Sequence, residues 1–175
     1  MPTTRERAPQ SQNKSMDRRD FLVSATAAGF ALAAGPVMAA TAITTPSEGL
    51  STKQIALPVQ GGRLPVYLAQ PARATHLPTV LVVQEIFGVH EYIRDVCRRL
   101  ARQGYLAIAP ELYFRQGDPS KLTSIPELQS QIVSQVPDDQ VLADLDACAA
   151  WAAQHGGDPA RLAITGFCWG GRIVW

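Results

Sequence analysis

The sequence RLAITGFCWGG, residues 161–171, places an apolar run directly before a glycine-rich turn. Residues 161–165 favour a β-strand, and the glycines that follow favour an abrupt change of direction into a helix. The turn reads Gly-x-Cys-x-Gly, with Cys168 at its centre. This form, with cysteine in place of serine, matches the strand-turn-helix pattern that presents a nucleophile at the top of a sheet.

The two outer glycines of this turn have a steric explanation. A strand that turns sharply into a helix strains the backbone of the central residue and brings neighbouring chain very close. We predict that Gly166 and Gly170 make room for this approach, and that the thiol of Cys168 stands clear of the sheet. The start of the helix would favour a thiolate, and the N–H of Trp169 would face a developing oxyanion. The alternative is a plain glycine-rich turn with a buried cysteine.

The elements before this turn alternate in type. Residues 79–84 are a continuous β-branched apolar run, which is typical of a strand buried on both faces of a parallel sheet. We expect strands at 53–59, 63–69, 79–84, 105–109 and 161–165, with a hairpin turn at Gly61-Gly62, and helices at 90–103, 126–134 and 140–154. This order predicts an α/β fold, a mostly parallel sheet flanked by helices, with an antiparallel start.

The two longer helices are expected to bury one face each. In the helix at 140–154, the residues expected on that face are Val141, Leu142, Leu145, Cys148, Ala149 and Ala152. Cys97 has a similar position in the helix at 90–103, so we interpret Cys97 and Cys148 as packing residues. No pair of cysteines has metal-ligand spacing, and we expect neither a metal nor a cofactor.

A second polar segment, Gln84-Glu85-Ile86-Phe87-Gly88, follows the buried strand at 79–84. Ligand sites of open α/β sheets form beyond the carboxyl ends of the strands, so Glu85 and Cys168 could lie close together. By analogy with related oxyanion holes, the backbone N–H of Ile86 would be the second oxyanion donor. The alternative for Glu85 is a solvated loop carboxylate.

The three histidines, His76, His90 and His155, are expected at the surface in loops or at helix ends. In hydrolases of this fold the order along the chain is nucleophile, acid, histidine. All three histidines precede Cys168, so none has the position expected of a catalytic base.

Residues 1–42 read as an export signal. Arg18-Arg19 precedes Phe21-Leu22, an Ala-rich apolar run follows to Ala34, and small residues close the segment. The twin arginine predicts export of a folded protein by the twin-arginine machinery, and a periplasmic or secreted location after cleavage. The apolar run is too short for a stable membrane span. The alternative is an amphipathic helix or uncleaved anchor. Residues 43–52 read as a linker.

The overall charge argues against a nucleic-acid partner. The formal net charge is +1, and the basic excess lies within residues 1–20. A nucleic-acid site would need a basic face on the folded domain.

Three segments together resemble the dienelactone hydrolase (carboxymethylenebutenolidase) family of the α/β-hydrolase superfamily. They are residues 84–88, the sequence Pro-Glu-Leu-Tyr-Phe-Arg-Gln at 110–116, and residues 166–171, and the similarity extends over 53–175. The resemblance implies hydrolysis of a small ester or lactone by a Cys-Asp-His triad, without a cofactor. Cys168 matches the nucleophile, Glu85 the carboxylate that contacts the resting thiol, and Ile86 and Trp169 the oxyanion donors. Arg115 lies in a matching segment, but the resemblance gives it no role.

The resemblance also implies that the triad's aspartate and histidine lie beyond residue 175. We therefore expect the chain to be the N-terminal part of an α/β-hydrolase, truncated after the nucleophile turn, inactive by itself, and with an exposed apolar sheet edge. No arginine occurs at 116–135, where the family has one that binds the substrate carboxylate, so a dienelactone substrate is not implied. Two other functions stay open: a non-catalytic binding protein, and a thiol redox protein that uses Cys168.

Overall fold

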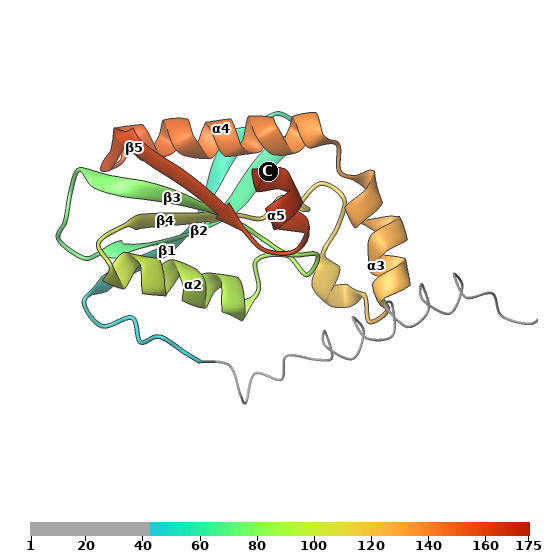
Figure 1. Cartoon of the computed structure of the whole chain (residues 1–175). Helices are drawn as coiled ribbons and strands as arrows, with labels where there is room; N and C mark the ends of the chain where they lie inside the picture. The colour runs from blue at the N-terminus through green and yellow to red at the C-terminus, as the bar shows by residue number, and fades with distance from the viewer. Residues whose placement is uncertain (1–42) are drawn as a thin grey trace, which may run out of the picture. The chain divides into compact units, whose positions relative to one another are not determined.

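A computed structural model describes residues 43–175, and its first two strands form a long antiparallel hairpin (Figure 1). β1 (Leu50–Val59) pairs with β2 (Gly62–Pro71) along its whole length. The turn uses positive φ angles of 83° at Gly61 and 146° at Gly62, which glycine adopts without steric penalty. The predicted hairpin is confirmed, and its strands are longer than the sequence indicated.

Three further strands complete the sheet: β3 (Leu77–Val83), β4 (Leu106–Pro110) and β5 (Gly157–Gly166). β4 pairs antiparallel with β2 and parallel with β3, and β3 pairs parallel with β5. The order across the sheet is β1-β2-β4-β3-β5. The predicted α/β class and its antiparallel start are therefore confirmed.

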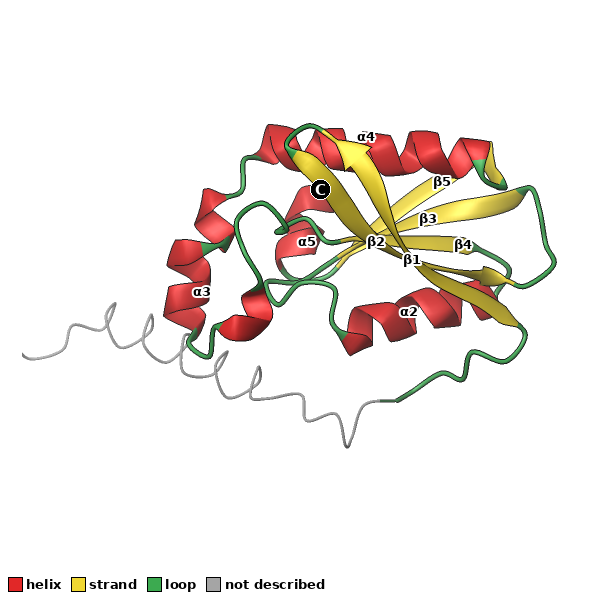
Figure 2. Cartoon of the chain, turned by 180° about the vertical axis from the view of Figure 1, so that it is seen from behind, coloured by secondary structure: helices red, strands yellow, loops and turns green. Residues whose placement is uncertain are grey.

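Helices cover both faces of this sheet (Figures 1 and 2). α2 (Glu91–Arg102) packs on one face, and α4 (Asp138–Gln154) and α5 (Trp169–Val174) pack on the other. Side chains alternate along β3, so Val80 and Val82 join the α2 side while Leu81 and Val83 join the α4 side. Because both faces of β3 are buried, its sequence is continuously apolar.

The chain between β4 and α4 is only partly helical. It contains α3 (Ile125–Gln131) and two short 3-10 helices, η1 (Pro119–Lys121) and η2 (Val133–Gln135). The helix predicted at 126–134 is therefore confirmed in its first part, and its end is a separate 3-10 turn.

The predicted buried face of α4 is wrong at one position. Val141, Leu145 and Cys148 are buried, but Leu142 is 53% exposed. Positions 141, 145 and 148 recur at intervals of four and three residues, while position 142 is turned by about 100° from its neighbour. The buried face is thus narrower than expected, and it includes the charged Asp144.

β5 begins earlier than predicted. Leu77 is opposite Gly157 and Thr79 is opposite Leu162, so β5 has extra residues at this point. Asp158 and Pro159 lie inside the strand, where an Asp158 carboxylate oxygen accepts a hydrogen bond from the Ala160 N–H at 2.9 Å.

The interpretation of residues 43–52 as a linker requires correction. β1 begins at Leu50, and the residues before it are hydrogen-bonded to α2. The N–H of Thr45 donates to the buried carboxylate of Asp95, and the carbonyl of Thr45 accepts a hydrogen bond from Arg98 at 2.8 Å. A polar segment that reads as a linker is fixed here because buried charged groups need its backbone as partners.

The predicted export signal lies outside the described residues. Among residues 43–175, no helix has both the length and the apolar character that crossing a membrane requires.

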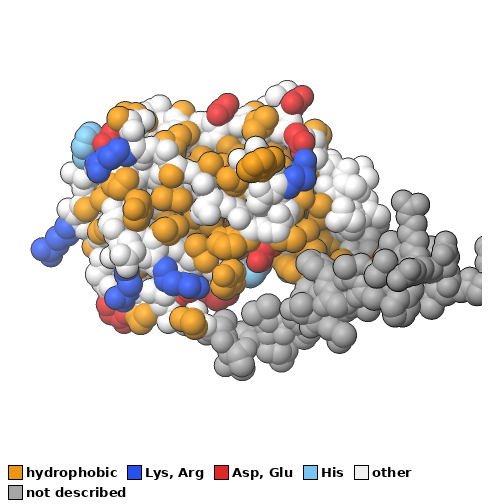
Figure 3. Space-filling model, viewed as in Figure 1, with side chains coloured by type: hydrophobic (Ala, Val, Ile, Leu, Met, Phe, Trp, Pro, Cys, Tyr) orange, Lys and Arg blue, Asp and Glu red, His pale blue; other side chains and the backbone are white. Residues whose placement is uncertain are grey.

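Apolar side chains gather on the face of the molecule that carries β5 and α5 (Figure 3). Leu162 is 50% exposed and Ile164 is 39% exposed, although both belong to a strand of the sheet. β5 is the terminal strand in the observed order, so these exposures agree with the expected apolar edge.

Candidate active site at the β5–α5 turn

The backbone of Cys168 has a strained conformation. Its φ is 53° and its ψ is −115°, a region that residues with a side chain rarely occupy. β5 ends at Gly166 and α5 begins at Trp169, so the chain changes from strand to helix with only two residues between them. Cys168 is exposed. The alternative of a turn with a buried cysteine is therefore wrong.

The glycines at 166 and 170 are required by close contacts. A Cβ atom on Gly166 would collide with the carbonyl group of Gly170. A Cβ atom on Gly170 would lie 2.5 Å from the carbonyl oxygen of Gln84 and 2.6 Å from that of Val83. Real Cβ atoms do not approach backbone so closely, so α5 can start here only because both positions lack side chains. The second contact also brings the turn against the end of β3.

The segment that follows β3 is attached to the segment that follows β4. The buried Gln84 side chain accepts a hydrogen bond from the N–H of Leu112 at 3.1 Å. The Glu111 carboxylate, in the segment after β4, accepts a second hydrogen bond from the N–H of Val89, in the segment after β3, at 2.8 Å. Gly88 has a φ of 77°, and a Cβ atom there would lie 2.9 Å from a Glu111 carboxylate oxygen. These contacts fix the loop that carries Glu85 and Ile86.

Glu111 is partly buried, and within residues 43–175 its carboxylate forms no ion pair with a cationic side chain. Burial raises its pKa above the ordinary value, although the N–H groups of Val89 and Tyr113 act in the opposite direction. One of its oxygens, the Gln84 amide nitrogen and the Tyr113 hydroxyl are all buried without a hydrogen-bond partner. The Tyr113 ring lies 5.0 Å from the Trp169 ring, so this polar cluster is adjacent to the start of α5.

The carboxylate of Glu85 pairs with His90. The Glu85 Oε2 and His90 Nε2 atoms are 2.6 Å apart. His90 is also the N-cap of α2, where its Nδ1 accepts a hydrogen bond from the N–H of Tyr92 at 3.3 Å. The expected contact between Glu85 and the Cys168 thiol stays a prediction.

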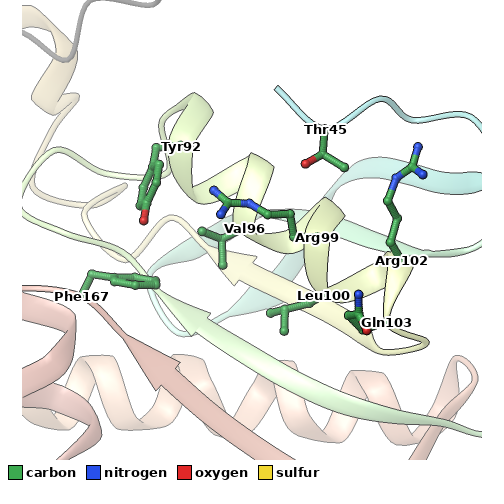
Figure 4. A pocket seen from close by; sticks show the side chains of 8 residues that line it. All are labelled: Thr45, Tyr92, Val96, Arg99, Leu100, Arg102, Gln103 and Phe167. Atoms are coloured by element: carbon green, nitrogen blue, oxygen red, sulfur yellow. The ribbon is translucent and has the colours of Figure 1, made fainter. Parts of the chain in front are cut away.

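An open pocket of about 490 Å³ lies along α2 (Figure 4). Its lining residues are Thr45, Tyr92, Val96, Arg99, Leu100, Arg102, Gln103 and Phe167. Tyr92 and Phe167 meet edge to face, with ring centroids 5.9 Å apart. The pocket does not include Cys168, Glu85 or Ile86, so we do not assign it to the chemistry of the turn.

Arg115 connects two elements of the fold. Its guanidinium forms two hydrogen bonds with the carboxylate of the buried Asp144, at 2.7 and 2.9 Å. It also donates to the carbonyl of Gln60 in the hairpin turn, at 2.9 Å, and lies over the ring of Phe114. Arg115 therefore joins the β1–β2 turn to α4, which gives this residue the role that the sequence did not supply.

The remaining cysteines and histidines lie away from the turn. Cys97 and Cys148 are buried, and burial raises the pKa of each thiol to about 12. His155 lies at the end of α4, where its Nδ1 is 2.8 Å from the carbonyl oxygen of Trp151. His76 pairs with Asp158. Within residues 43–175, no group of three His, Cys, Asp or Glu side chains could hold a metal ion.

The sequence analysis did not predict the contacts that two residues of this region make. His90 is expected from the sequence in a loop or at a helix end, and it is the N-cap of α2, but its contact with Glu85 was not predicted. Glu111 lies in one of the three quoted segments, but nothing in its local sequence shows that its carboxylate is buried against Val89.

The chain has close relatives among known proteins. A sequence model of the dienelactone hydrolase family matches residues 64–175. A "Putative carboxymethylenebutenolidase" of Methylorubrum extorquens is 56% identical over 162 residues, which cover 92% of this chain and 56% of the relative. A protein of the same description from Escherichia coli K12 is 59% identical over 148 residues, 84% of this chain and 54% of the relative.

A solved structure agrees with these sequence matches. The crystal structure of a "Putative Dienelactone Hydrolase" from Klebsiella pneumoniae is 64% identical, with a TM-score of 0.70 over 72% of this chain and 53% of that chain. The chain spans about half the length of the curated relatives it matches. The sequence matches and the shared fold lead to one conclusion: the chain belongs to the dienelactone hydrolase family of the α/β-hydrolase superfamily.

Proposed function

We propose that the full-length protein hydrolyses small esters or lactones with Cys168 as the nucleophile. The observation that carries this proposal is the exposed cysteine with a φ of 53° between two glycines that no larger residue could replace. Strain of this kind is retained in a fold when it serves the position of a reactive side chain.

The proposed reaction has two steps. The Cys168 thiolate attacks the carbonyl carbon, the bond to the leaving oxygen breaks, and the alcohol departs with a proton while an acyl thioester remains on the enzyme. Water then attacks the thioester, which releases the carboxylic acid and restores the thiol. We expect the histidine that accepts and returns these protons, and the aspartate that orients it, to follow Cys168 in the chain, as the order in this fold requires.

Two backbone N–H groups are proposed to stabilise the oxyanion of each step. They belong to Trp169, the first residue of α5, and to Ile86, in the loop after β3. Within the described part of the chain, neither donates a hydrogen bond to another backbone carbonyl outside the regular elements. Unpaired N–H groups that converge on one point are the usual means of holding such an oxyanion.

The proposal is tested with the full-length protein and a p-nitrophenyl ester. Cys168→Ala is expected to lower kcat/KM by at least about 1,000-fold, because removal of a nucleophile leaves only the binding and oxyanion contributions. Cys148→Ala serves as the matched control, since Cys148 is a buried cysteine of α4 and should leave kcat/KM within about threefold. Hydrolysis unaffected by Cys168→Ala would overturn the proposal.

Labelling separates the proposed enzyme from the two other functions. An ester that acylates the nucleophile should add one acyl group per protein, located at Cys168 by peptide mass analysis. Binding of the ester without acylation would favour a non-catalytic binding protein. A stable disulfide of Cys168 under oxidising conditions, without acylation, would favour a thiol redox protein.

We also propose that residues 43–175 alone have no esterase activity, since we expect the aspartate and histidine of the triad to lie outside this segment. Expression of this segment should give either insoluble protein or a soluble protein that leaves the p-nitrophenyl ester intact. Hydrolysis by the segment that Cys168→Ala abolishes would contradict this statement.

The location of the protein is proposed to be periplasmic, or secreted after signal cleavage. The twin arginine at Arg18-Arg19 followed by an apolar run supports export by the twin-arginine machinery. The double substitution Arg18→Lys with Arg19→Lys should retain the protein in the cytoplasm. A periplasmic form whose N-terminal sequence begins at Met1 or Pro2 would contradict cleavage.

A further inference from the structure

The first turn of α2 contacts both sides of the candidate active site. His90, directly before the helix, pairs with Glu85 at 2.6 Å. Tyr92, two residues later, packs edge to face on Phe167, the residue before Cys168. The His90 and Tyr92 rings are themselves stacked, with centroids 6.3 Å apart. A continuous set of contacts therefore joins the Glu85 carboxylate to the nucleophile turn through α2.

The two hydrogen bonds of His90 define its tautomer. Because Nδ1 accepts from the N–H of Tyr92, that nitrogen carries no proton. The proton of the neutral ring is then on Nε2, which donates to the Glu85 carboxylate. The pair thus binds one oxygen of Glu85 in a fixed direction and leaves the other oxygen free for a second partner.

We propose that His90 is a positioning residue that fixes the Glu85 carboxylate beside the Cys168 thiol and so keeps the resting thiol protonated. This inference rests on the proposed function, in which Cys168 is the nucleophile, and on the predicted contact of Glu85 with its thiol. A carboxylate held near a thiol disfavours the thiolate, because two negative charges would then be close together.

His90 performs two tasks that one substitution can separate. Asparagine is among the best N-cap residues, so His90→Asn keeps an acceptor for the N–H of Tyr92. Its side chain is shorter and cannot reach Glu85 in the same way. His90→Asn therefore removes the contact with the carboxylate and retains the cap. His155→Asn is the matched control, since His155 is at the far end of α4 and contacts Trp151 instead.

The readout is the rate at which iodoacetamide alkylates the full-length protein between pH 5 and 9. Cys97 and Cys148 are buried and have pKa values of about 12, so peptide mass analysis should find the label at Cys168. Tyr113, whose pKa burial raises, interacts electrostatically with Cys168 and with Arg172, which pairs with Asp138. Tyr113 and Arg172 are unchanged in every variant, so differences between variants report the Glu85 carboxylate.

The expected result is a faster reaction when the carboxylate is released. At pH 7, Glu85→Gln should increase the alkylation rate about tenfold, since the removal of a nearby negative charge favours the thiolate. His90→Asn should increase it about threefold or more, with a thermal unfolding midpoint close to that of the wild type. In the double variant the rate should equal that of Glu85→Gln alone, because His90 acts only through Glu85.

Each other outcome identifies what has failed. If Glu85→Gln accelerates alkylation and His90→Asn gives an unchanged or slower rate, His90 does not position Glu85 and the inference is wrong. If His90→Asn accelerates the reaction equally in both backgrounds, its effect does not pass through Glu85, and the inference is also wrong. If Glu85→Gln has no effect, Glu85 is not beside the thiol, which removes both the inference and the proposed role of Glu85. The nucleophile itself is tested separately by Cys168→Ala.

Discussion

Asp95 is a buried carboxylate and Glu111 is a partly buried one with one buried oxygen, but their surroundings are opposite. Asp95 contacts Arg99 at 2.7 Å and Arg98 at 3.2 Å and accepts the N–H of Thr45. These partners outweigh burial and hold its pKa below the ordinary value. Glu111 accepts the N–H of Val89, has one oxygen without a partner, and burial raises its pKa.

This difference distinguishes a carboxylate that stabilises the fold, Asp95, from one that supports the candidate active site, Glu111. The charge of Asp95 is neutralised, and its contacts attach the segment before β1 to α2. The charge of Glu111 is not neutralised by a cationic side chain. Its carboxylate holds the loop of Glu85 and Ile86 next to the nucleophile turn. Buried charge without neutralisation lowers stability, and folds tolerate this near functional sites. Four predictions follow from this comparison.

The largest effect is expected from Asp95→Ala. The substitution leaves the N–H of Thr45 without its partner and removes a carboxylate from the buried Arg98, so we expect the free energy of unfolding to fall by about 3 kcal/mol. Urea denaturation of the full-length protein measures this. The exposed Asp139 in the first turn of α4 provides the control, because Asp139→Ala should change the free energy by less than about 0.5 kcal/mol. Equal losses in the two variants would contradict the assignment of Asp95 to the scaffold.

Glu111→Ala should affect activity more than its effect on stability predicts. Loss of the acceptor for Val89 frees the loop that carries Ile86, and a displacement of about 1 Å at a reacting centre can lower the rate roughly 100-fold. Glu111→Gln keeps an acceptor oxygen and should stay within about fivefold of the wild type. Asp95→Ala, measured where it is folded, should stay within about twofold. If Asp95→Ala and Glu111→Ala lower kcat/KM equally, the two regions are not distinct in function.

The pH dependence of stability should have opposite signs at the two carboxylates. Glu111 has a raised pKa in the folded protein, so the folded state binds its proton more tightly, and its contribution to stability is lost as pH rises from about 4.5 through that pKa. Asp95 has a lowered pKa, so its contribution is present above about 3.8 and is lost as pH falls through the folded value.

Urea denaturation at several pH values tests these signs. The stability difference between Glu111→Gln and the wild type should change in favour of the variant as pH rises, with a slope of at most about 1.4 kcal/mol per pH unit. A difference that does not vary between pH 4.5 and 8 would show that Glu111 has an ordinary pKa.

The smallest effect is expected from Arg99→Ala. Arg99 pairs with Asp95, but its side chain is 44% exposed, and solvent weakens such pairs. Asp95 keeps Thr45 and Arg98, so we expect a loss of about 0.5 kcal/mol in the free energy of unfolding. A loss as large as that of Asp95→Ala would mean that Arg99 alone stabilises the buried carboxylate.

Prediction from sequence was most successful where local pattern and tertiary structure impose the same requirement. The apolar run at 79–84 is buried on both faces of β3, and Gly61-Gly62 forms the turn that a hairpin needs. It was less successful where packing decides among similar residues. Leu142 has the same apolar character as Val141, but it is turned by about 100° around the helix axis from Val141 and lies outside the buried face.

By itself, the sequence determined the class of fold and the turn around Cys168, because periodicity and the need for glycine are local properties of the chain. It indicated the family only through the resemblance of three short motifs. Only the tertiary structure decided the partners of the charged and polar residues. It placed His90 on Glu85, Glu111 on Val89, and Arg115 between the hairpin turn and α4. The physical reason is that a buried polar atom takes whichever partner the packed elements bring within about 3 Å, and that distance depends on the whole fold.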